Sequence, residues 1–263
     1  MADQTVADDA GSDDDDLRRR RDFAHDLSPG GCVVGDPRLI YRHHITPPTS
    51  LSERAYREIR RLIVRLELAP GAVIRDDDLQ QRLGLGRTPI REALQRLVRD
   101  QFVTVIPRRG MFVSTVDVDD LTSLYETRSM LEPYAIRLAC TRGTAAQWDE
   151  MAAVLDAAAT TDDPDTLLEV DRHCRELVWE AAGNRFLTDT LDMLYSQSDR
   201  LWHLYIGDVA DLRGMVDEHR EILAALRARD ADRAADLIAA HMGRFDEQIR
   251  AAVRRRLDSP LIA

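Results

Sequence analysis

Four arginines in the N-terminal half of the chain occupy positions from which they can contact DNA. Arg87 and Arg91 are four residues apart, so they share one face of a helix predicted to begin near Thr88. Either guanidinium can pair with guanine or bind a phosphate, and the helix N-terminus adds backbone donors for a phosphate. Arg108 and Arg109 lie at the tip of a predicted hairpin and can reach the DNA backbone or the minor groove. A single arginine on a helix is usually only solvated, but four in this arrangement favour DNA binding.

The elements that position these arginines are predicted from hydrophobic spacing and turn residues. Ser52 and Glu53 suit the start of the first helix, and Thr88 can cap the third helix with Pro89 at its first position. The expected order is a helix from residue 51 that ends at Pro70-Gly71, a helix over 76–83, a tight turn at 84–86, a helix from Thr88 to about Arg99, and strands over 102–106 and 111–115 joined by the hairpin 107–110. This order is that of a winged helix-turn-helix, whose recognition helix enters the major groove with its N-terminal end.

Net charge varies along the chain in step with this prediction. Residues 51–116 carry a formal charge of +5, whereas residues 1–50 carry −4 and residues 117–263 carry −12, within a total of −11. A basic segment between two acidic ones is typical of a nucleic-acid-binding module attached to another domain.

Cysteine usage and the N-terminus indicate a cytoplasmic protein without membrane contact. The three cysteines are far apart and form no CxxC pair, as expected for free thiols in a reducing compartment. No stretch approaches about 18 consecutive apolar residues, so no transmembrane helix is expected. Aspartates precede the first basic residue, which is the reverse of a secretory signal.

Composition and periodicity divide the chain into three regions. Residues 1–48 combine aspartate and arginine runs with proline and glycine, and they are predicted to be a disordered tail. Residues 49–116 are the predicted winged helix-turn-helix, and residues 117–258 read as entirely helical. Helices are expected over 118–141, 144–159, 164–181, 186–206, 209–228 and 231–257. Six helices of this length make an antiparallel bundle, so the predicted fold class is mainly α, a winged helix-turn-helix followed by an all-α bundle.

The basic segment resembles the DNA-binding domain of the GntR family over about residues 51–116. The resemblance is carried by Leu66-Glu67-Leu68-Ala69-Pro70-Gly71, by Leu83-Gly84-Leu85-Gly86-Arg87-Thr88-Pro89-Ile90-Arg91-Glu92-Ala93-Leu94, and by Arg109-Gly110. It implies DNA contact by Arg87, Thr88, Arg91 and Gly110. The sequence departs from the family at Gly86, where serine or threonine is usual and often contacts a phosphate, so one contact fewer is implied.

The C-terminal region resembles the FadR-type effector domain of the same family, called FCD, over about residues 118–245. The landmarks are Arg128 and Glu132 in the first bundle helix, Asp171 and Arg175, Gly183-Asn184, His219 and His241. This resemblance implies a bundle that binds a small effector, expected to be an organic acid, and that forms a homodimer.

The same resemblance raises a question about a metal. Many FCD domains hold a divalent metal with an aspartate, a histidine one turn later and two further histidines. Here the matching residues are Asp171, His219 and His241, and Arg175 occupies the first histidine position. One alternative is a zinc or nickel site of the 2-His-1-carboxylate type. The other is a metal-free pocket in which Arg175 pairs with Asp171 and binds a carboxylate effector together with Arg128. A purely structural pair is the third reading.

These features predict a homodimeric transcription regulator that binds double-stranded operator DNA, with repression the favoured sign. Two functions from other classes compete with it: a metal-dependent enzyme of the 2-His-1-carboxylate type and a non-specific architectural DNA-binding protein. An enzyme has no need of the arginine-bearing winged domain, and the sequence contains no GxSxG, no phosphate-binding glycine loop and no HExxH. The expected protein is therefore not an enzyme.

Overall fold

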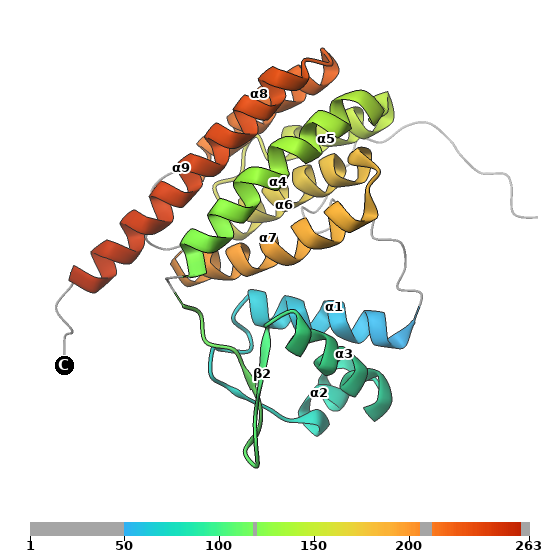
Figure 1. Cartoon of the computed structure of the whole chain (residues 1–263), viewed down its shortest axis with the longest axis vertical. Coiled ribbons are helices and arrows are strands. Elements are labelled where there is room, and N and C mark those ends of the chain that lie inside the picture. Colours follow the sequence, from blue (N-terminus) through green and yellow to red (C-terminus); the bar gives the residue numbers. More distant parts are fainter. Residues whose placement is uncertain (1–49, 118–119, 206–211, 259–263) are drawn as a thin grey trace, which may run out of the picture. The chain divides into compact units, whose positions relative to one another are not determined.

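A computed structural model of the chain has two hydrophobic cores (Figure 1). The structure describes residues 50–117, 120–205 and 212–258. The predicted disordered tail, residues 1–48, lies outside these ranges. Buried hydrophobic side chains form one cluster in the N-terminal described segment and a second, larger one in the helices that follow. The predicted fold class, mainly α with a winged helix-turn-helix before a helical bundle, is confirmed.

The segment 50–117 folds as helices and a small antiparallel sheet. Its elements are α1 (Leu51–Val64), β1 (Val73–Ile74), α2 (Asp76–Leu83), α3 (Arg87–Arg99), β2 (Val103–Ile106) and β3 (Gly110–Val113). The strand order is β1-β3-β2, with Val73 opposite Phe112 and Val103 opposite Val113. Sequence analysis missed β1, because a strand of two residues is too short to show a period-two pattern. The hairpin of β2 and β3 is the predicted wing.

α1 begins at Leu51, where the sequence predicts the first helix to begin. Ser50, rather than Ser52, is the N-cap, and its Oγ accepts a hydrogen bond from the backbone N–H of Glu53 at 3.1 Å. Ser52 and Glu53, which suit a helix start, therefore lie in the first turn of α1.

α3 starts two residues earlier than the predicted first position at Pro89. Gly84 ends α2 in the left-handed conformation, with φ of 64°, so the chain reverses within two residues and α3 begins at Arg87. Gly86 is therefore the N-cap, and Thr88 lies inside the first turn instead of capping it. Because glycine has no side chain, no side-chain acceptor satisfies the first N–H groups of α3.

The helices of the C-terminal part agree with the predicted ones to within a few residues at most ends. They are α4 (Asp120–Arg142), α5 (Ala145–Ala157), α6 (Pro164–Ala182), α7 (Arg185–Tyr205), α8 (Gly214–Arg227) and α9 (Ala231–Asp258). The start of α8 was predicted at residue 209, but residues 212 and 213 form a bend. α4 contacts α6, α7, α8 and α9, so it is the central helix of the bundle.

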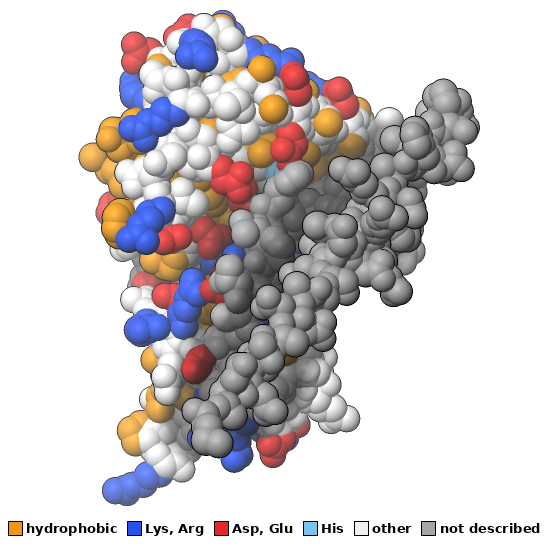
Figure 2. Space-filling view, turned by 90° about the vertical axis from the view of Figure 1, so that its right-hand side faces the viewer, with side chains coloured by type: hydrophobic (Ala, Val, Ile, Leu, Met, Phe, Trp, Pro, Cys, Tyr) orange, Lys and Arg blue, Asp and Glu red, His pale blue; other side chains and the backbone are white. Residues whose placement is uncertain are grey.

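The surface mixes charged and hydrophobic side chains. Acidic, basic and hydrophobic groups are interspersed on the face shown in Figure 2. On α4, Met130 and Tyr134 are 77% and 54% exposed, and they lie one helical turn apart. Within the described ranges, no helix is both long enough and apolar enough to cross a membrane.

Candidate functional site

The N-terminal end of α3 presents the side chains that the sequence assigned to DNA. Arg87, Thr88 and Arg91 are all exposed. Arg91 donates from Nε to Oδ2 of Asp76 in α2 at 2.9 Å, with 60% of its side chain exposed. Arg87 makes no side-chain hydrogen bond or ion pair with any residue that the structure describes. Among the described residues, Arg87 therefore has no side-chain partner, and Arg91 is held by a surface ion pair of about 1 kcal/mol or less.

The tip of the wing carries the second group of predicted contacts. Arg108 and Arg109 lie between β2 and β3, Gly110 is the first residue of β3, and all three are exposed. Gly110 has φ of 107°, a conformation that side chains rarely adopt, so the tight hairpin requires glycine there. The Arg109 guanidinium lies 6.0 Å from the centre of the Phe112 ring. The turn thus presents two neighbouring arginines to the solvent.

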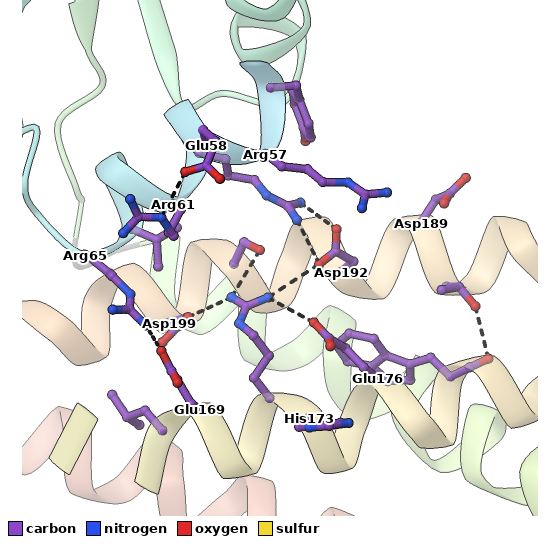
Figure 3. A pocket seen from close by; sticks show the side chains of 18 of the residues that line it. Arg57, Glu58, Arg61, Arg65, Glu169, His173, Glu176, Asp189, Asp192 and Asp199 are labelled. Carbon is purple, nitrogen blue, oxygen red and sulfur yellow. Dashed lines mark hydrogen bonds and ion pairs between the residues drawn. The ribbon is translucent and has the colours of Figure 1, made fainter. Parts of the chain in front are cut away.

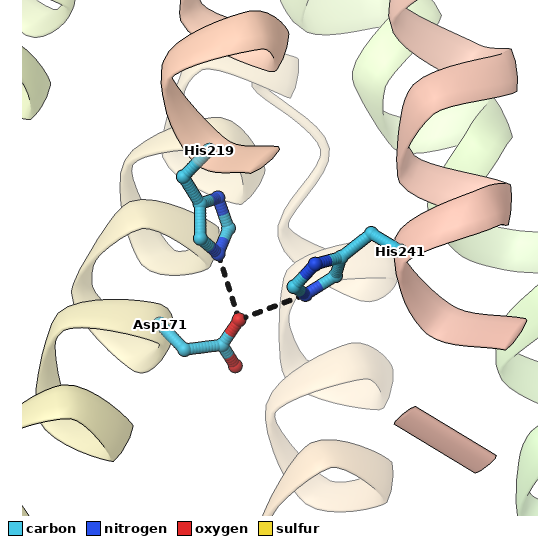
Figure 4. A group of neighbouring side chains, drawn as sticks. All are labelled: Asp171, His219 and His241. Atoms are coloured by element: carbon cyan, nitrogen blue, oxygen red, sulfur yellow. Dashed lines mark hydrogen bonds and ion pairs between the residues drawn. The ribbon is translucent and has the colours of Figure 1, made fainter. Parts of the chain in front are cut away.

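The three residues assigned to a metal meet inside the bundle (Figure 4). Asp171 comes from α6, His219 from α8 and His241 from α9. Nε2 of His219 lies 2.7 Å and Nε2 of His241 lies 3.1 Å from the same oxygen, Oδ1 of Asp171. Their ligand atoms all lie within 4.8 Å of one another, and all three side chains are buried.

Two buried arginines and a second carboxylate adjoin this group. Arg175 donates from Nε to Oδ2 of Asp171 at 2.9 Å and from Nη1 to Oε2 of Glu132 at 2.7 Å. Arg128 donates from Nε and Nη2 to Oε1 of Glu132 at 3.1 and 2.6 Å. Arginine and carboxylate therefore alternate in a chain of four buried charges that sums to zero, in the order Arg128, Glu132, Arg175, Asp171.

Tyr195 of α7 packs against this chain of charges. Its hydroxyl donates to Oδ2 of Asp171 at 2.8 Å. The guanidinium carbons of Arg128 and Arg175 lie 5.1 and 5.5 Å from its ring centre, within the range of a cation–π contact. The tyrosine therefore touches three of the four charged residues.

The pKa values show which groups keep their charge. Burial alone would raise the pKa of Asp171, but the charge of Arg175 and the contacts of the two histidines hold it well below its ordinary value. Burial opposes ionisation of Glu132 as well, and the two arginines hold its pKa below the ordinary value. Burial, and then the nearby Asp171 charge, raise the pKa of Tyr195 well above its ordinary value. Burial lowers the pKa of His219. At neutral pH the site therefore contains two carboxylates, a neutral phenol and a neutral His219.

The donor atoms fit a metal at three positions. Nδ1 of His241 lies 2.5 Å from Oε2 of Glu218, and a neutral imidazole has only one N–H. When that N–H faces Glu218, the Nε2 lone pair points toward Asp171 and His219, where a cation is well placed. A carboxylate behind a histidine is the usual outer support of a metal ligand. The guanidinium of Arg175 takes the place of a fourth ligand, and its charge repels a metal.

The space beside the four charges is small. A cavity of about 40 Å³ is lined by Arg128, Asp171, Arg175 and Tyr195 among others. That volume admits one to a few water molecules. A larger ligand therefore enters only if some of the buried ion pairs exchange partners.

Sequence analysis located the aspartate, the two histidines and the two arginines, and the structure brings all five together. Sequence analysis missed the roles of Glu132, Tyr195 and Glu218. The spacing of four residues between Arg128 and Glu132 was a usable signal, because such residues share a helix face. Tyr195 carried no signal, since its partners lie on other helices.

Comparisons with known proteins agree in both halves of the chain. Residues 51–113 match the family model "Bacterial regulatory proteins, gntR family", and residues 123–244 match the model "FCD domain". The HTH-type transcriptional repressor RspR of Escherichia coli is 24% identical over 78% of this chain and 92% of its own length. The Nta operon transcriptional regulator of Aminobacter aminovorans is 29% identical over 76% of this chain and 98% of its own length. The solved structure of E. coli McbR/YncC has the same fold, with a TM-score of 0.70 and 24% identity over 79% of this chain and 99% of that chain.

We expect Asp171 to make stability depend on pH in the acid range. The pKa of Asp171 is lower in the folded chain than in the unfolded chain, where an aspartate titrates near about pH 3.9. As the pH falls, Asp171 takes up a proton in the unfolded chain first. The stabilisation of the folded state by ionised Asp171 is therefore fully present above the unfolded-state pKa and is lost as the pH falls through the folded-state pKa. Urea unfolding from about pH 7 to 3 should show the stability difference between wild type and Asp171→Asn shrinking toward acid. A difference that does not change with pH would contradict this assignment.

Proposed function

Because this chain belongs to the GntR family and carries an FCD domain behind its winged helix-turn-helix, it is a DNA-binding transcription regulator, and we propose that a small carboxylate controls its operator affinity from inside the helical domain. Its relatives are regulators, which confirms the prediction that the chain is not an enzyme. Repression is the proposed sign, because relatives such as RspR and GlaR of E. coli are named repressors.

The observation that carries the effector proposal is the pair of buried arginines that share Glu132. A guanidinium binds a carboxylate through two parallel hydrogen bonds, and a buried one requires such a partner. A carboxylate ligand offers Arg128 and Arg175 the same oxygen atoms that Glu132 supplies. Binding is therefore an exchange of one carboxylate for another at the two arginines, and the displaced Glu132 has to reach water or take up a proton for the site to stay neutral.

The exchange has a structural consequence. Glu132 belongs to α4, whereas Arg175 and Asp171 belong to α6. A ligand that takes Arg175 weakens the link between these two helices and frees one oxygen of Asp171. We infer that effector binding shifts α6 against α4, and that this shift changes how the winged domains fit two operator half-sites.

A divalent metal is the second candidate occupant. The convergence of Asp171, His219 and His241, with Glu218 behind His241, favours it. A bound zinc or nickel ion would supply a positive charge that attracts a carboxylate effector. In that case Asp171 would face the metal, and Arg175 would turn toward the ligand.

For the DNA interface, we propose that Arg87, Thr88 and Arg91 contact the major groove. Arg108, Arg109 and Gly110 contact the adjacent backbone or minor groove from the wing. The exposure of all six residues supports this assignment. The absence of a side-chain cap at Gly86 leaves backbone donors of α3 available to a phosphate.

Substitution at the N-terminal end of α3 tests this interface. Arg87→Ala and Arg91→Ala should each weaken specific binding by about 1–3 kcal/mol if the arginine pairs with a base. Arg185→Ala is the matched control, because Arg185 is an exposed arginine of α7 outside the winged domain. Gel shift with a DNA site selected by the wild-type protein from a random pool measures the change. Wild-type affinity in both α3 variants would refute the assignment.

The assembly follows from what one recognition helix can read. A single helix contacts too few base pairs for genomic specificity, so two are needed. The exposed Met130 and Tyr134 on the bundle are apolar surface that a second copy can cover. We expect a dimer in light scattering at micromolar concentration and a two-fold symmetric footprint, with half-sites close together. A monomer combined with an asymmetric footprint would count against a homodimer.

Arg175→His distinguishes the two occupants of the helical domain. If the native site is a metal-free arginine pocket, this variant completes a four-ligand set, so the affinity for zinc or nickel should rise. Added carboxylates should then no longer stabilise the folded protein against unfolding. If a metal is already bound tightly, its affinity should change little. Calorimetry and metal content by mass spectrometry decide, with Arg175→Gln as the variant that removes the charge and adds no ligand. A stoichiometric metal in the wild type would overturn the metal-free pocket.

A further inference from the structure

Two consecutive residues of α6 face the two functional parts of the molecule. Asp171 is 1% exposed and points into the bundle, where Arg175 and the two histidines hold it. Arg172 is the next residue, about 100° further round the helix. Arg172 lines the cavity between the bundle and α1, together with Asp192 and Asp199 of α7, which Figure 3 labels. One helix turn therefore joins the effector site to the surface that contacts the DNA-binding domain.

Arg172 is held by two aspartates of α7. Its Nη2 donates to Oδ2 of Asp199 at 2.7 Å, and its Nη1 lies 3.6 Å from Oδ1 of Asp192. Nη1 also lies 3.8 Å from Oε1 of Glu176, one turn along α6. The guanidinium thus has a close partner in Asp199 and a longer, weaker contact with Asp192.

Asp192 is shared with the DNA-binding domain. Arg60 of α1 donates to both of its oxygens, from Nη1 at 2.5 Å and from Nη2 at 3.2 Å. Burial would raise the pKa of Asp192, but the charges of Arg60 and Arg172 hold it below its ordinary value. One carboxylate therefore lies between a cation of the helical domain and a cation of the winged domain.

Tyr195 connects this surface with the effector site. Its hydroxyl donates to Asp171, and its ring centre lies 4.7 Å from the guanidinium carbon of Arg172. The same ring contacts Arg175, which is proposed to bind the effector. A change of partner at Asp171 or Arg175 therefore acts directly on the ring against which Arg172 lies.

The surface around Arg60 has room for rearrangement. A cavity of about 490 Å³ lies between α1 and the helices α6 and α7, and charged side chains form most of its lining. Other contacts across this surface are polar too: Arg65 pairs with Glu169, and Gln197 donates to the carbonyl of Asp100 at 2.8 Å. An interface made of ion pairs beside a cavity has alternative pairings at similar energy, unlike a packed apolar one.

We propose that Arg172 is a positioning residue that transmits the state of the effector site to the DNA-binding domain through Tyr195 and Asp192. This inference rests on the proposed function, since it assumes that the buried site controls DNA affinity. When Tyr195 shifts, the distance between Arg172 and Asp192 changes. The ion pair between Asp192 and Arg60 then becomes stronger or weaker. The orientation of α1, and with it α3, follows because α1 packs on α3.

A double-mutant cycle tests the link without knowledge of the effector. Asp171→Asn perturbs the effector site, and Arg172→Gln removes the proposed link. Affinity of the full-length protein for a DNA site selected by the wild type from a random pool is the readout. We expect Asp171→Asn to change this affinity at least about fivefold in the wild-type background, and to have no effect in the Arg172→Gln background.

Two further variants distinguish loss of coupling between the two sites from a general loss of structure. Arg61→Gln is the matched control, because Arg61 follows Arg60 on α1 but pairs with Glu58 and Glu67 inside its own domain. The effect of Asp171→Asn should persist in that background. Arg172→Lys keeps the charge and should restore part of the effect, which a purely structural role of Arg172 would not require.

Protection of α1 in hydrogen exchange provides an independent readout. Asp171→Asn should change the exchange of amides around Arg60 in the wild-type background and leave them unchanged in the Arg172→Gln background. Where Asp171→Asn does not fold, Tyr195→Phe replaces it, because this change removes only the hydroxyl that donates to Asp171.

The outcomes separate this inference from the proposed function. An effect of Asp171→Asn that is equally large with and without Arg172 overturns the link and leaves effector control intact. No effect of either Asp171→Asn or Tyr195→Phe on DNA affinity in any background overturns the proposed function itself, and the link with it. Loss of the effect in Arg172→Gln alone, with persistence in Arg61→Gln, supports the link.

Discussion

The ion pair between Asp171 and Arg175 is the constraint on which the rest of the helical domain depends. Both side chains are almost completely buried, and an unpaired charge at that depth costs several kcal/mol. Neighbouring polar groups supply the remaining partners of the pair: Glu132 accepts from Arg175, while Tyr195, His219 and His241 contact Asp171. The helices α4, α6, α7, α8 and α9 must therefore keep their mutual positions, or the charges must find new partners.

The guanidinium also changes the character of the site relative to a metal centre. A metal ion accepts several geometries around it, whereas an arginine donates along fixed directions in one plane. Because Arg175 needs Glu132 from α4 and Asp171 from its own helix, any ligand it binds has to lie in that plane. Under the proposed function, the helical domain is therefore more selective for flat, two-oxygen groups such as carboxylates than a metal alone would be.

The sequence was sufficient for the helices and the wing, because these depend on spacing along the chain. The five ionisable residues of the site came from the resemblance to the FCD domain. The sequence failed where the answer depends on three-dimensional neighbours. Glu132 lies 43 residues from Arg175, and Tyr195 lies 24 residues from Asp171, so no helical period links them. The start of α3 failed for a related reason, since Thr88 is a competent cap by residue type and only the folded backbone places the cap at Gly86.

The ion pair between Arg91 and Asp76 bears on how the protein rejects the wrong DNA. A free arginine loses about 2 kcal/mol of rotamer entropy when it is fixed, and Asp76 has already restricted this side chain. The carboxylate also repels phosphates, whereas the guanine edge is uncharged. A contact that merely follows the backbone is thus penalised more than one that reads a base. In the proposed interface, Asp76 therefore acts as an electrostatic filter that favours sites where Arg91 pairs with a guanine.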